Sequence, residues 1–278
     1  MVSFLSQFES GSSRNNMNHQ IRFRSLFLVV YFNIIVNASP IQNYLERERH
    51  QWEREFSYVV SIRKNGIYNC GGAIIDELTI LTAAHCVDRS IKSNVIRQLT
   101  VVTGSDQMYQ GGTIHKVCRG TFYPGYERNK VGSKPDDIAV LTLCEPMIFN
   151  EYQNKINLPS SDFIDNTTAV VAGWGYENYE EKELSCYIQK FNPKIIHSNH
   201  CMPYGYYKLK KGQLCAIHKA TQGPCRGISG SPLVSRKEII GIVSWGPPRC
   251  STGDPEVYTN VYEYLSFITL VKNNLIFY

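Results

Sequence analysis

From Phe56 onward the chain consists of short stretches rich in β-branched residues, which alternate in polarity and stop at Gly, Asn or Pro. The clearest are Ser57–Arg63, Gly72–Leu81, Leu99–Gly104, Ile138–Leu143, Thr168–Gly173 and Ile239–Trp245. Many short strands at spacings of about 8–12 residues are typical of antiparallel barrels or sandwiches. Only Tyr262–Asn274 has apolar residues at helical spacing, so we expect one terminal helix in an all-β chain.

Length and charge exclude several classes of protein. The 278 residues are enough to bury a substantial core. The net charge of +5 is modest and forms no long basic run, so we expect no nucleic-acid partner. We also expect no cofactor and no metal site.

The N-terminal region indicates export. Arg22 and Arg24 precede an apolar stretch, Leu26–Val36, which ends at a suitable signal-peptidase site before Ser39. The stretch is shorter than the roughly 20 residues that cross a bilayer, so we expect secretion and no membrane anchor. Residues 1–38 are predicted to be leader and signal peptide, with Met1 and Met17 both open as starts. Residues 39–55 are predicted to be a charged N-terminal segment. Its charge-dense part, 42–55, is predicted to be a solvated leader, with a short helix as the alternative.

Secretion changes how the nine cysteines are interpreted. An oxidising compartment favours disulfides, and the chain has no Cys-x-x-Cys pair that would indicate zinc or thioredoxin chemistry. Because nine is odd, at least one thiol is left over or pairs outside the chain. The sequon Asn166-Thr167-Thr168 is a candidate glycan acceptor and would then have to be exposed.

Three motifs together indicate acyl-transfer chemistry. Gly227–Pro232 (Gly-Ile-Ser-Gly-Ser-Pro) places the Ser229 hydroxyl on a tight bend, and His85 and Asp137 each lie beside strand-like segments. A serine hydroxyl is a poor nucleophile at neutral pH, so a neutral imidazole has to take its proton. A carboxylate then holds the imidazole in one tautomer and stabilises its developing charge. Each motif alone is weak, but their combination is not a chance match.

From Cys70 to its C-terminus the chain resembles the chymotrypsin/trypsin family of serine proteases. The supporting signatures are Cys70-Gly71-Gly72, Gly173-Trp174-Gly175, Ser244-Trp245-Gly246 and Pro255-Glu256-Val257-Tyr258. The resemblance implies an all-β fold of two six-stranded antiparallel Greek-key barrels with a C-terminal helix. The implied protease domain covers residues 56–278, with barrel one at about 56–155, barrel two at about 156–262 and the helix at about 262–274.

The resemblance also implies the roles of individual residues. His85 would act as base and then acid, Asp137 rather than Asp136 would orient it, and Ser229 would carry the acyl group. The N–H groups of Gly227 and Ser229 would form the oxyanion hole. The implied substrate-binding residues are Gly223, Ser244, Trp245, Gly246 and Glu256. The expected partners are protein or peptide substrates and protein protease inhibitors. We expect the protein to be extracellular and monomeric.

Cysteine pairing follows from the same resemblance. By position it implies the disulfides Cys70–Cys86, Cys201–Cys215 and Cys225–Cys250. Cys118 and Cys144 lie on segments that we expect to be adjacent antiparallel strands, so we predict a fourth bridge there. Cys186 is then left over, and we expect a buried thiol, with an intermolecular disulfide as the alternative.

Two departures from the family concern activation. Family zymogens are cleaved to free an Ile-Val-Gly-Gly end, whose ammonium pairs with an aspartate just before the catalytic serine. Here the aligned start is Leu45-Glu46-Arg47-Glu48, and the aspartate position is Ile228. Removing one partner of a buried ion pair costs roughly 3–5 kcal/mol, and losing both avoids this penalty.

Two hypotheses therefore stay open. In one, the chain is a serine endopeptidase whose oxyanion loop is held by apolar packing of Ile228. In the other, it is a non-catalytic protease homologue that acts as a binding or regulatory protein, consistent with Ser231 where the family usually has glycine. The specificity pocket departs too, because its floor is Gly223 and its wall carries Glu256. That carboxylate could attract a basic side chain, block a large apolar one or turn into solvent.

Overall fold

The computed structural model describes residues 54–92, 95–127, 134–176, 185–201, 209–219, 227–247 and 253–275. The predicted leader, residues 1–38, lies outside these ranges. Within the described ranges, no helix combines the length and the apolar character that a bilayer-crossing helix requires.

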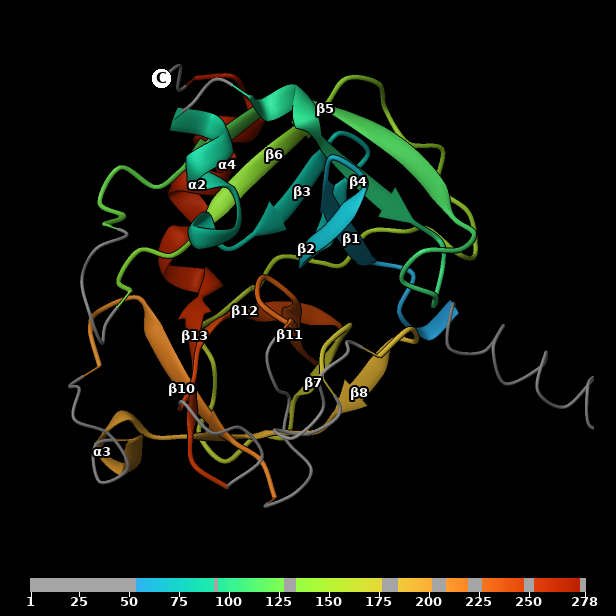
Figure 1. Cartoon of the computed structure of the whole chain (residues 1–278). Helices are drawn as coiled ribbons and strands as arrows, with labels where there is room; N and C mark the ends of the chain where they lie inside the picture. Colours follow the sequence, from blue (N-terminus) through green and yellow to red (C-terminus); the bar gives the residue numbers. More distant parts are fainter. Residues whose placement is uncertain are drawn as a thin grey trace, which may run out of the picture. The chain divides into compact units, whose positions relative to one another are not determined.

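Six strands form the first barrel (Figure 1). They are β1 (Val59–Lys64), β2 (Ile67–Asp76), β3 (Thr79–Thr82), β4 (Leu99–Thr103), β5 (Thr113–Phe122) and β6 (Ala139–Leu143). Their order is β1-β2-β3-β6-β5-β4, and β4 closes the barrel by pairing with β1. All neighbours in the barrel run antiparallel.

Local sequence explains why this barrel forms. Asn65 and Gly66 join β1 to β2 with φ angles of 51° and 81°, the two left-handed residues that a tight hairpin turn needs. The inward-facing aliphatic side chains of the strands form one buried cluster, which includes Ile62, Ile74 and Leu141. Burying this apolar surface contributes about 25 cal/mol per Å² to the free energy of folding and so stabilises the closed barrel.

The second sheet has seven strands (Figure 1). They are β7 (Val170–Gly173), β8 (Gln189–Phe191), β9 (Lys194–Ile196), β10 (Gln213–Ile217), β11 (Pro232–Ser235), β12 (Glu238–Trp245) and β13 (Glu256–Asn260). The order is β8-β7-β11-β12-β13-β10-β9, and every neighbouring pair is antiparallel.

The seventh strand arises from a break at one proline. β8 and β9 are separated only by Asn192 and Pro193, and proline has no N–H to donate to a ladder. β8 pairs with β7, and β9 pairs with β10. The two strands therefore stand at opposite ends of the strand order, although they follow each other in the chain. Together they act as the sixth strand of a nearly closed barrel. The fold class predicted from the sequence is thus confirmed, with this interruption as the difference.

Helices are more numerous than the sequence indicated. The expected C-terminal helix is present as the 3₁₀ turn η3 (Val261–Tyr264) followed by α4 (Leu265–Lys272). In the described ranges, α2 (Ala84–Lys92), η1 (Ile96–Gln98) and α3 (Ser198–Cys201) are further helical segments, which we did not predict. Phe267, Ile268 and Val271 of α4 pack in one cluster with side chains of β2, β6 and β12, so α4 contacts both sheets.

The structure joins Cys70 to Cys86, Cys118 to Cys144 and Cys201 to Cys215. Cys225 and Cys250 lie outside the described residues. The expectation that Cys186 is buried is wrong, because its side chain is exposed while its carbonyl accepts a hydrogen bond from Met108 N–H (2.8 Å).

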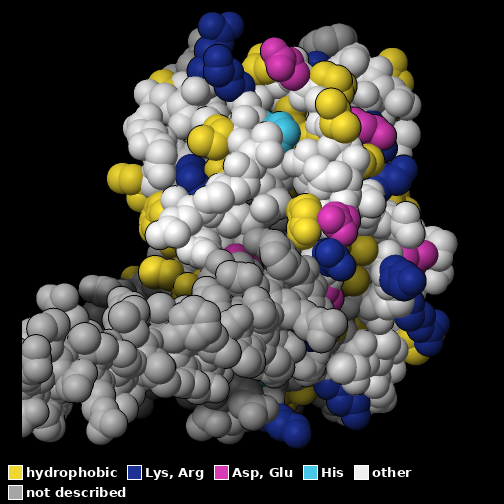
Figure 2. Space-filling view, turned by 90° about the vertical axis from the view of Figure 1, so that its right-hand side faces the viewer, with side chains coloured by type: hydrophobic (Ala, Val, Ile, Leu, Met, Phe, Trp, Pro, Cys, Tyr) yellow, Lys and Arg dark blue, Asp and Glu magenta, His cyan; other side chains and the backbone are white. Residues whose placement is uncertain are grey.

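On the face drawn in Figure 2, the coloured Lys and Arg side chains are interspersed with Asp and Glu.

Candidate active site

Strand pairing brings His85 and Asp137 together. β3 pairs with β6 so that Thr82 lies opposite Ala139, which places the residues after β3 beside those before β6. His85 lies in the first turn of α2, and Asp137 lies two residues before β6. Asp137 Oδ2 is 2.7 Å from His85 Nδ1, and Asp137 Oδ1 accepts the His85 backbone N–H at 2.8 Å. The carboxylate therefore fixes both the ring and the backbone of His85.

Asp137 is fully buried, and residues of the second sheet donate hydrogen bonds to both its carboxylate and its backbone carbonyl. Ser244 Oγ donates to Asp137 Oδ2 (2.6 Å), and Thr259 Oγ1 donates to the Asp137 carbonyl (2.8 Å). Burial alone would raise the pKa of Asp137. His85 and the hydrogen bonds from His85 and Ser244 outweigh it and hold that pKa below its ordinary value. The side chain is thus held as a carboxylate.

Sequence reasoning missed two of these contacts. Ser244 was expected only as a partner of the substrate backbone, and Thr259 was not considered at all. Both lie on the second sheet, on β12 and β13, far in sequence from Asp137. No local pattern marks such a hydrogen bond. Asp136, which was not assigned the orienting role, accepts a hydrogen bond from Tyr264 OH (2.7 Å).

The Ser229 loop lies against the same corner of the first barrel. Gly71 N–H donates to the Ser229 carbonyl (2.9 Å). Gly230 has a φ of 80°, and a Cβ there would overlap Thr82 Oγ1 and the Gly71 carbonyl. This bend therefore requires glycine, and it sets Ser229 beside the β3–α2 connection that carries His85.

Ile228 is 3% exposed and belongs to the core of the second sheet. Its neighbours in that cluster include Val171, Leu233 and Val243. On the other side of the loop, the hydroxyl of buried Tyr68 lies 2.9 Å from the Gly227 carbonyl and 3.1 Å from the Trp174 carbonyl. The loop is thus held by apolar packing and by a hydroxyl, without a buried ion pair at Ile228.

Ser231 lies in a tightly packed place. The residue is fully buried, and a Cβ on either Gly71 or Gly173 would overlap its Oγ. Among the described residues, Ser231 Oγ has no hydrogen-bond partner. Two glycines therefore make the room that this serine occupies.

Glu256 lies at the start of β13 next to Gly246, whose added Cβ would come within 3.3 Å of Glu256 Cγ. The side chain is not in solvent, because the residue is 8% exposed. Its Oε2 accepts from Tyr258 OH (3.1 Å) and lies 3.3 Å from Nε2 of buried His218. This rules out the solvent orientation considered above. The predicted floor residue Gly223 lies outside the described residues.

One group in the described ranges has the composition of a metal site, namely Cys70, His85 and Cys86. Both sulfur atoms are joined to each other in a disulfide, so neither can act as a thiolate ligand. The disulfide instead packs against the imidazole ring, since Cys86 Sγ lies 3.8 Å from His85 Nε2.

Comparisons with known proteins identify the family. Residues 42–268 match the family model described as Trypsin. The chain is 30% identical to trypsin alpha of Drosophila melanogaster over 223 residues, which cover 79% of this chain and 84% of that protein. It is 31% identical to trypsin beta of Drosophila erecta over 216 residues, covering 77% and 82%.

A solved structure shares the fold. Neuropsin, a serine protease expressed in the limbic system of mouse brain, matches with a TM-score of 0.72 at 22% identity. The match covers 79% of this chain and 96% of that one, and at this identity it concerns the fold. The chain therefore belongs to the trypsin family of serine proteases.

Proposed function

We propose that the chain is a secreted serine endopeptidase that cleaves peptide bonds through an acyl-enzyme on Ser229. The observation that carries the proposal is the buried Asp137 carboxylate, 2.7 Å from His85 Nδ1 and ionised by its surroundings. A carboxylate in this position keeps the proton on Nδ1, so that Nε2 is the unprotonated nitrogen that accepts one.

The reaction would proceed in two halves. Ser229 Oγ attacks the peptide carbonyl while its proton passes to His85 Nε2, and the tetrahedral intermediate collapses when His85 returns that proton to the leaving amine. Water then repeats the sequence on the ester and releases the acid. The backbone N–H groups of Gly227 and Ser229 would stabilise the oxyanion, each contributing about 3–4 kcal/mol to the transition state.

Ile228 would replace the family's activating ion pair. An aspartate at this position needs a buried ammonium beside it, whereas isoleucine needs only an apolar site. The packing of Ile228 in the second-sheet core and the hydrogen bond from Tyr68 to Gly227 supply such support. We infer that the oxyanion loop is ready for catalysis without a cleaved N-terminus.

Substrate selection would depend on the wall of the pocket. We propose that Ser244, Trp245 and Gly246 pair with the substrate backbone and that Glu256, with Gly223 at the floor, meets the side chain before the scissile bond. One oxygen of Glu256, Oε2, already accepts from Tyr258 OH and contacts His218 Nε2, so only part of the carboxylate is available to a substrate. Such a wall would select basic side chains less strongly than a free carboxylate does.

The remaining parts of the proposal concern the whole chain. Residues 1–38 would direct secretion, residues 39–55 would form a charged segment, and residues 56–278 would be the protease domain. The enzyme would act as a monomer outside the cell on proteins or peptides and would be open to protein protease inhibitors. It would need no cofactor.

The test uses a fluorophosphonate probe, which labels only a serine that is activated by its base and oxyanion hole. The parent protein should be labelled, and Ser229→Ala should not. A matched pair tests the orienting role: Asp137→Asn should lower kcat by about 10⁴-fold, and Asp136→Asn should leave kcat near that of the parent. If the parent protein is folded but takes no label, the proposal that it is an enzyme is overturned, and the hypothesis of a binding protein remains.

A further inference from the structure

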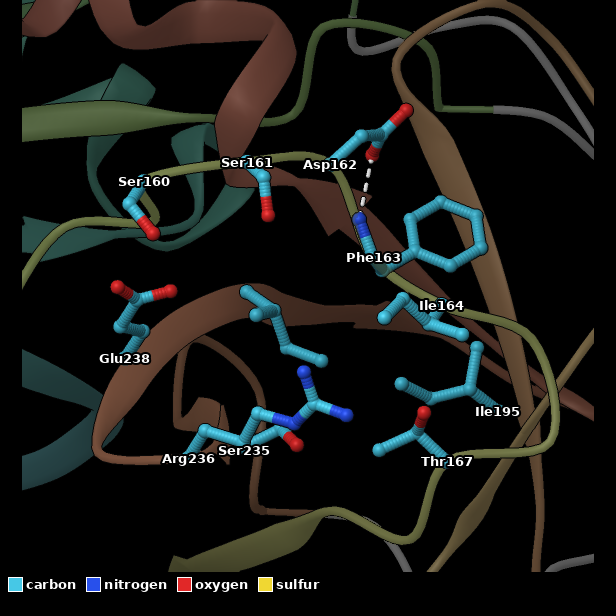
Figure 3. Close-up of a pocket in the computed structure, with 11 residues that line it drawn as sticks. Ser160, Ser161, Asp162, Phe163, Ile164, Thr167, Ile195, Ser235, Arg236 and Glu238 are labelled. Carbon is cyan, nitrogen blue, oxygen red and sulfur yellow. Dashed lines mark hydrogen bonds between the residues drawn. The ribbon is translucent and has the colours of Figure 1, made fainter.

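A pocket on the second sheet lies among residues that the proposed reaction does not use (Figure 3). One side is formed by the segment 160–167, and the other by the hairpin between β11 and β12. Ile195 of β9 and Ile240 of β12 lie between them and are buried. The pocket therefore has an apolar base and walls that come from two separate loops.

The walls combine polar and apolar groups (Figure 3). Ser161 and Arg236 direct a hydroxyl and a guanidinium toward the space between the two loops, and the Glu238 carboxylate lies at its end near Ser160. The Phe163 ring and Ile164, which is 55% exposed, supply the apolar wall. The donors and acceptors suit vicinal hydroxyl groups, and the apolar surface of Phe163 and Ile164 suits the C–H face of a sugar ring. The chemistry of the pocket thus matches a saccharide.

A covalent attachment point for a saccharide adjoins the pocket in the sequence. Asn166 stands between two lining residues, Ile164 and Thr167, and its side chain is exposed. It has a φ of 63°, which asparagine tolerates better than most residues. Asn166 N–H donates to the Ile195 carbonyl, and Ile195 N–H donates to the Thr167 carbonyl, both at 2.9 Å. The turn is therefore anchored to β9 while the acceptor side chain faces outward.

We propose that Asn166 carries an N-linked glycan and that its first sugars lie in this pocket. The proposal rests on the secretion proposed above, because the modification occurs in the secretory pathway. The new bond joins Asn166 Nδ2 to the anomeric carbon of the first sugar. The bond broken is the one between that carbon and the pyrophosphate of a lipid-linked oligosaccharide. The amide loses one proton, and the lipid pyrophosphate leaves with its electron pair, under the host's oligosaccharyl transferase.

Tethering explains why a shallow pocket can hold this ligand. A group linked to Asn166 has an effective concentration in the millimolar range or above, so weak contacts suffice. A free sugar would have no such advantage. The pocket and the acceptor are thus parts of one site.

The modification is tested on protein secreted from cultured eukaryotic cells, with a heterologous signal peptide in place of residues 1–38. We expect a glycosylated tryptic peptide that loses its sugar to peptide-N-glycosidase, with position 166 then read as Asp. Thr168→Ser keeps the sequon and should keep the glycan, whereas Thr168→Ala should abolish it. A secreted, unmodified parent protein overturns the proposal, and it does so without touching protease activity.

Occupation of the pocket is tested by thermal unfolding before and after deglycosylation of each variant. The parent should lose about 2–4 °C in Tm on deglycosylation. That difference should shrink in Ser161→Ala and Glu238→Ala while both stay glycosylated. Glu77→Gln, on the β2–β3 turn of the first barrel, should retain the full difference. An equal Tm with and without the glycan in the parent would overturn the placement of sugars in the pocket.

Discussion

Ser231 shows how one residue can carry an uncompensated polar group in the centre of a site. Its Oγ is buried among Gly71 and Gly173 and has no hydrogen-bond partner in the described part of the chain. A buried hydroxyl without a partner costs about 1–3 kcal/mol in desolvation. The methyl group of alanine fills most of the same volume without that cost.

Ser231→Ala should therefore stabilise the protein. We expect the free energy of unfolding to rise by about 1 kcal/mol and the Tm by about 2–4 °C, measured by denaturant and thermal unfolding. The matched control is Thr82→Val, because the buried Thr82 Oγ1 donates to the Gly71 carbonyl at 2.8 Å. That change should destabilise by about 1 kcal/mol. A loss of stability in Ser231→Ala would contradict an unpaired hydroxyl.

Tyr68 is the second residue whose role depends on one oxygen. Its hydroxyl reaches the Gly227 carbonyl, and Gly227 is a proposed oxyanion donor. Burial raises the pKa of Tyr68, so the group remains a neutral hydroxyl donor at physiological pH. Tyr68 would thus act as a positioning residue for the oxyanion loop.

Tyr68→Phe should lower kcat by about tenfold, equivalent to about 1.4 kcal/mol in the transition state, with KM changed by less than about twofold. A loss in kcat alone reports misplacement of the oxyanion donors, since substrate binding is unaffected. Peptide hydrolysis under steady-state conditions measures both constants. Tyr58→Phe is the control, because Tyr58 packs against the same cluster as Tyr68. Equal kcat values for the two variants would refute the role of Tyr68.

At the scale of elements, an ion pair connects the first barrel to the terminal helix. Lys272 Nζ, in the last turn of α4, lies 2.8 Å from Asp76 Oδ2 at the end of β2. Asp76 also caps its own turn, since Oδ1 accepts Leu78 N–H (3.0 Å). Burial raises the pKa of Asp76, but Lys272 and the other hydrogen bonds outweigh it and leave that pKa below its ordinary value.

The contribution of this pair should vanish in acid. Because the folded pKa of Asp76 is lower than its unfolded value, the stabilisation is complete above about pH 4 and is lost as the pH falls through the folded pKa. A double-mutant cycle of Asp76→Asn and Lys272→Met should give a coupling energy of about 0.5–1 kcal/mol at pH 7. Below pH 4 the coupling should shrink toward zero. A coupling of zero already at pH 7 would show that the pair does not anchor α4.

The elements also show which features a sequence reveals. Alternating strands and the C-terminal helix were predicted because each has a local period. The break between β8 and β9 depends on which neighbour each half pairs with, and α2 is short. Its apolar residues Ala84, Val87 and Ile91 do recur at helical spacing and pack on the first barrel. This helical spacing is present in the sequence itself, so α2 is predictable from a local signal.

For the whole molecule, the limit of prediction lies in contacts between the sheets. His85, Asp137 and Ser229 were found in the sequence because each lies in a short recognisable motif. The contacts of Ser244 with Asp137 and of Tyr68 with Gly227 join residues 107 and 159 positions apart. Such contacts form only when both barrels are folded, and no local pattern encodes them. Ile228 was recognised as a departure, but its support became visible only with the core cluster around it.

The same cluster leads to a prediction about activation. If Ile228 holds the oxyanion loop by packing, the protein needs no cleaved N-terminus. The full secreted chain and a chain that begins at Phe56 should therefore react with the fluorophosphonate probe at equal rates. Ile228→Val should keep labelling, because a smaller aliphatic side chain still fills the site at a cost of about 0.5–1.5 kcal/mol. Ile228→Asp should lose it, because an unpaired buried charge destabilises by roughly 3–5 kcal/mol. If instead labelling appears only after residues 39–55 are removed, the chain retains a proteolytic switch and Ile228 alone does not hold the loop.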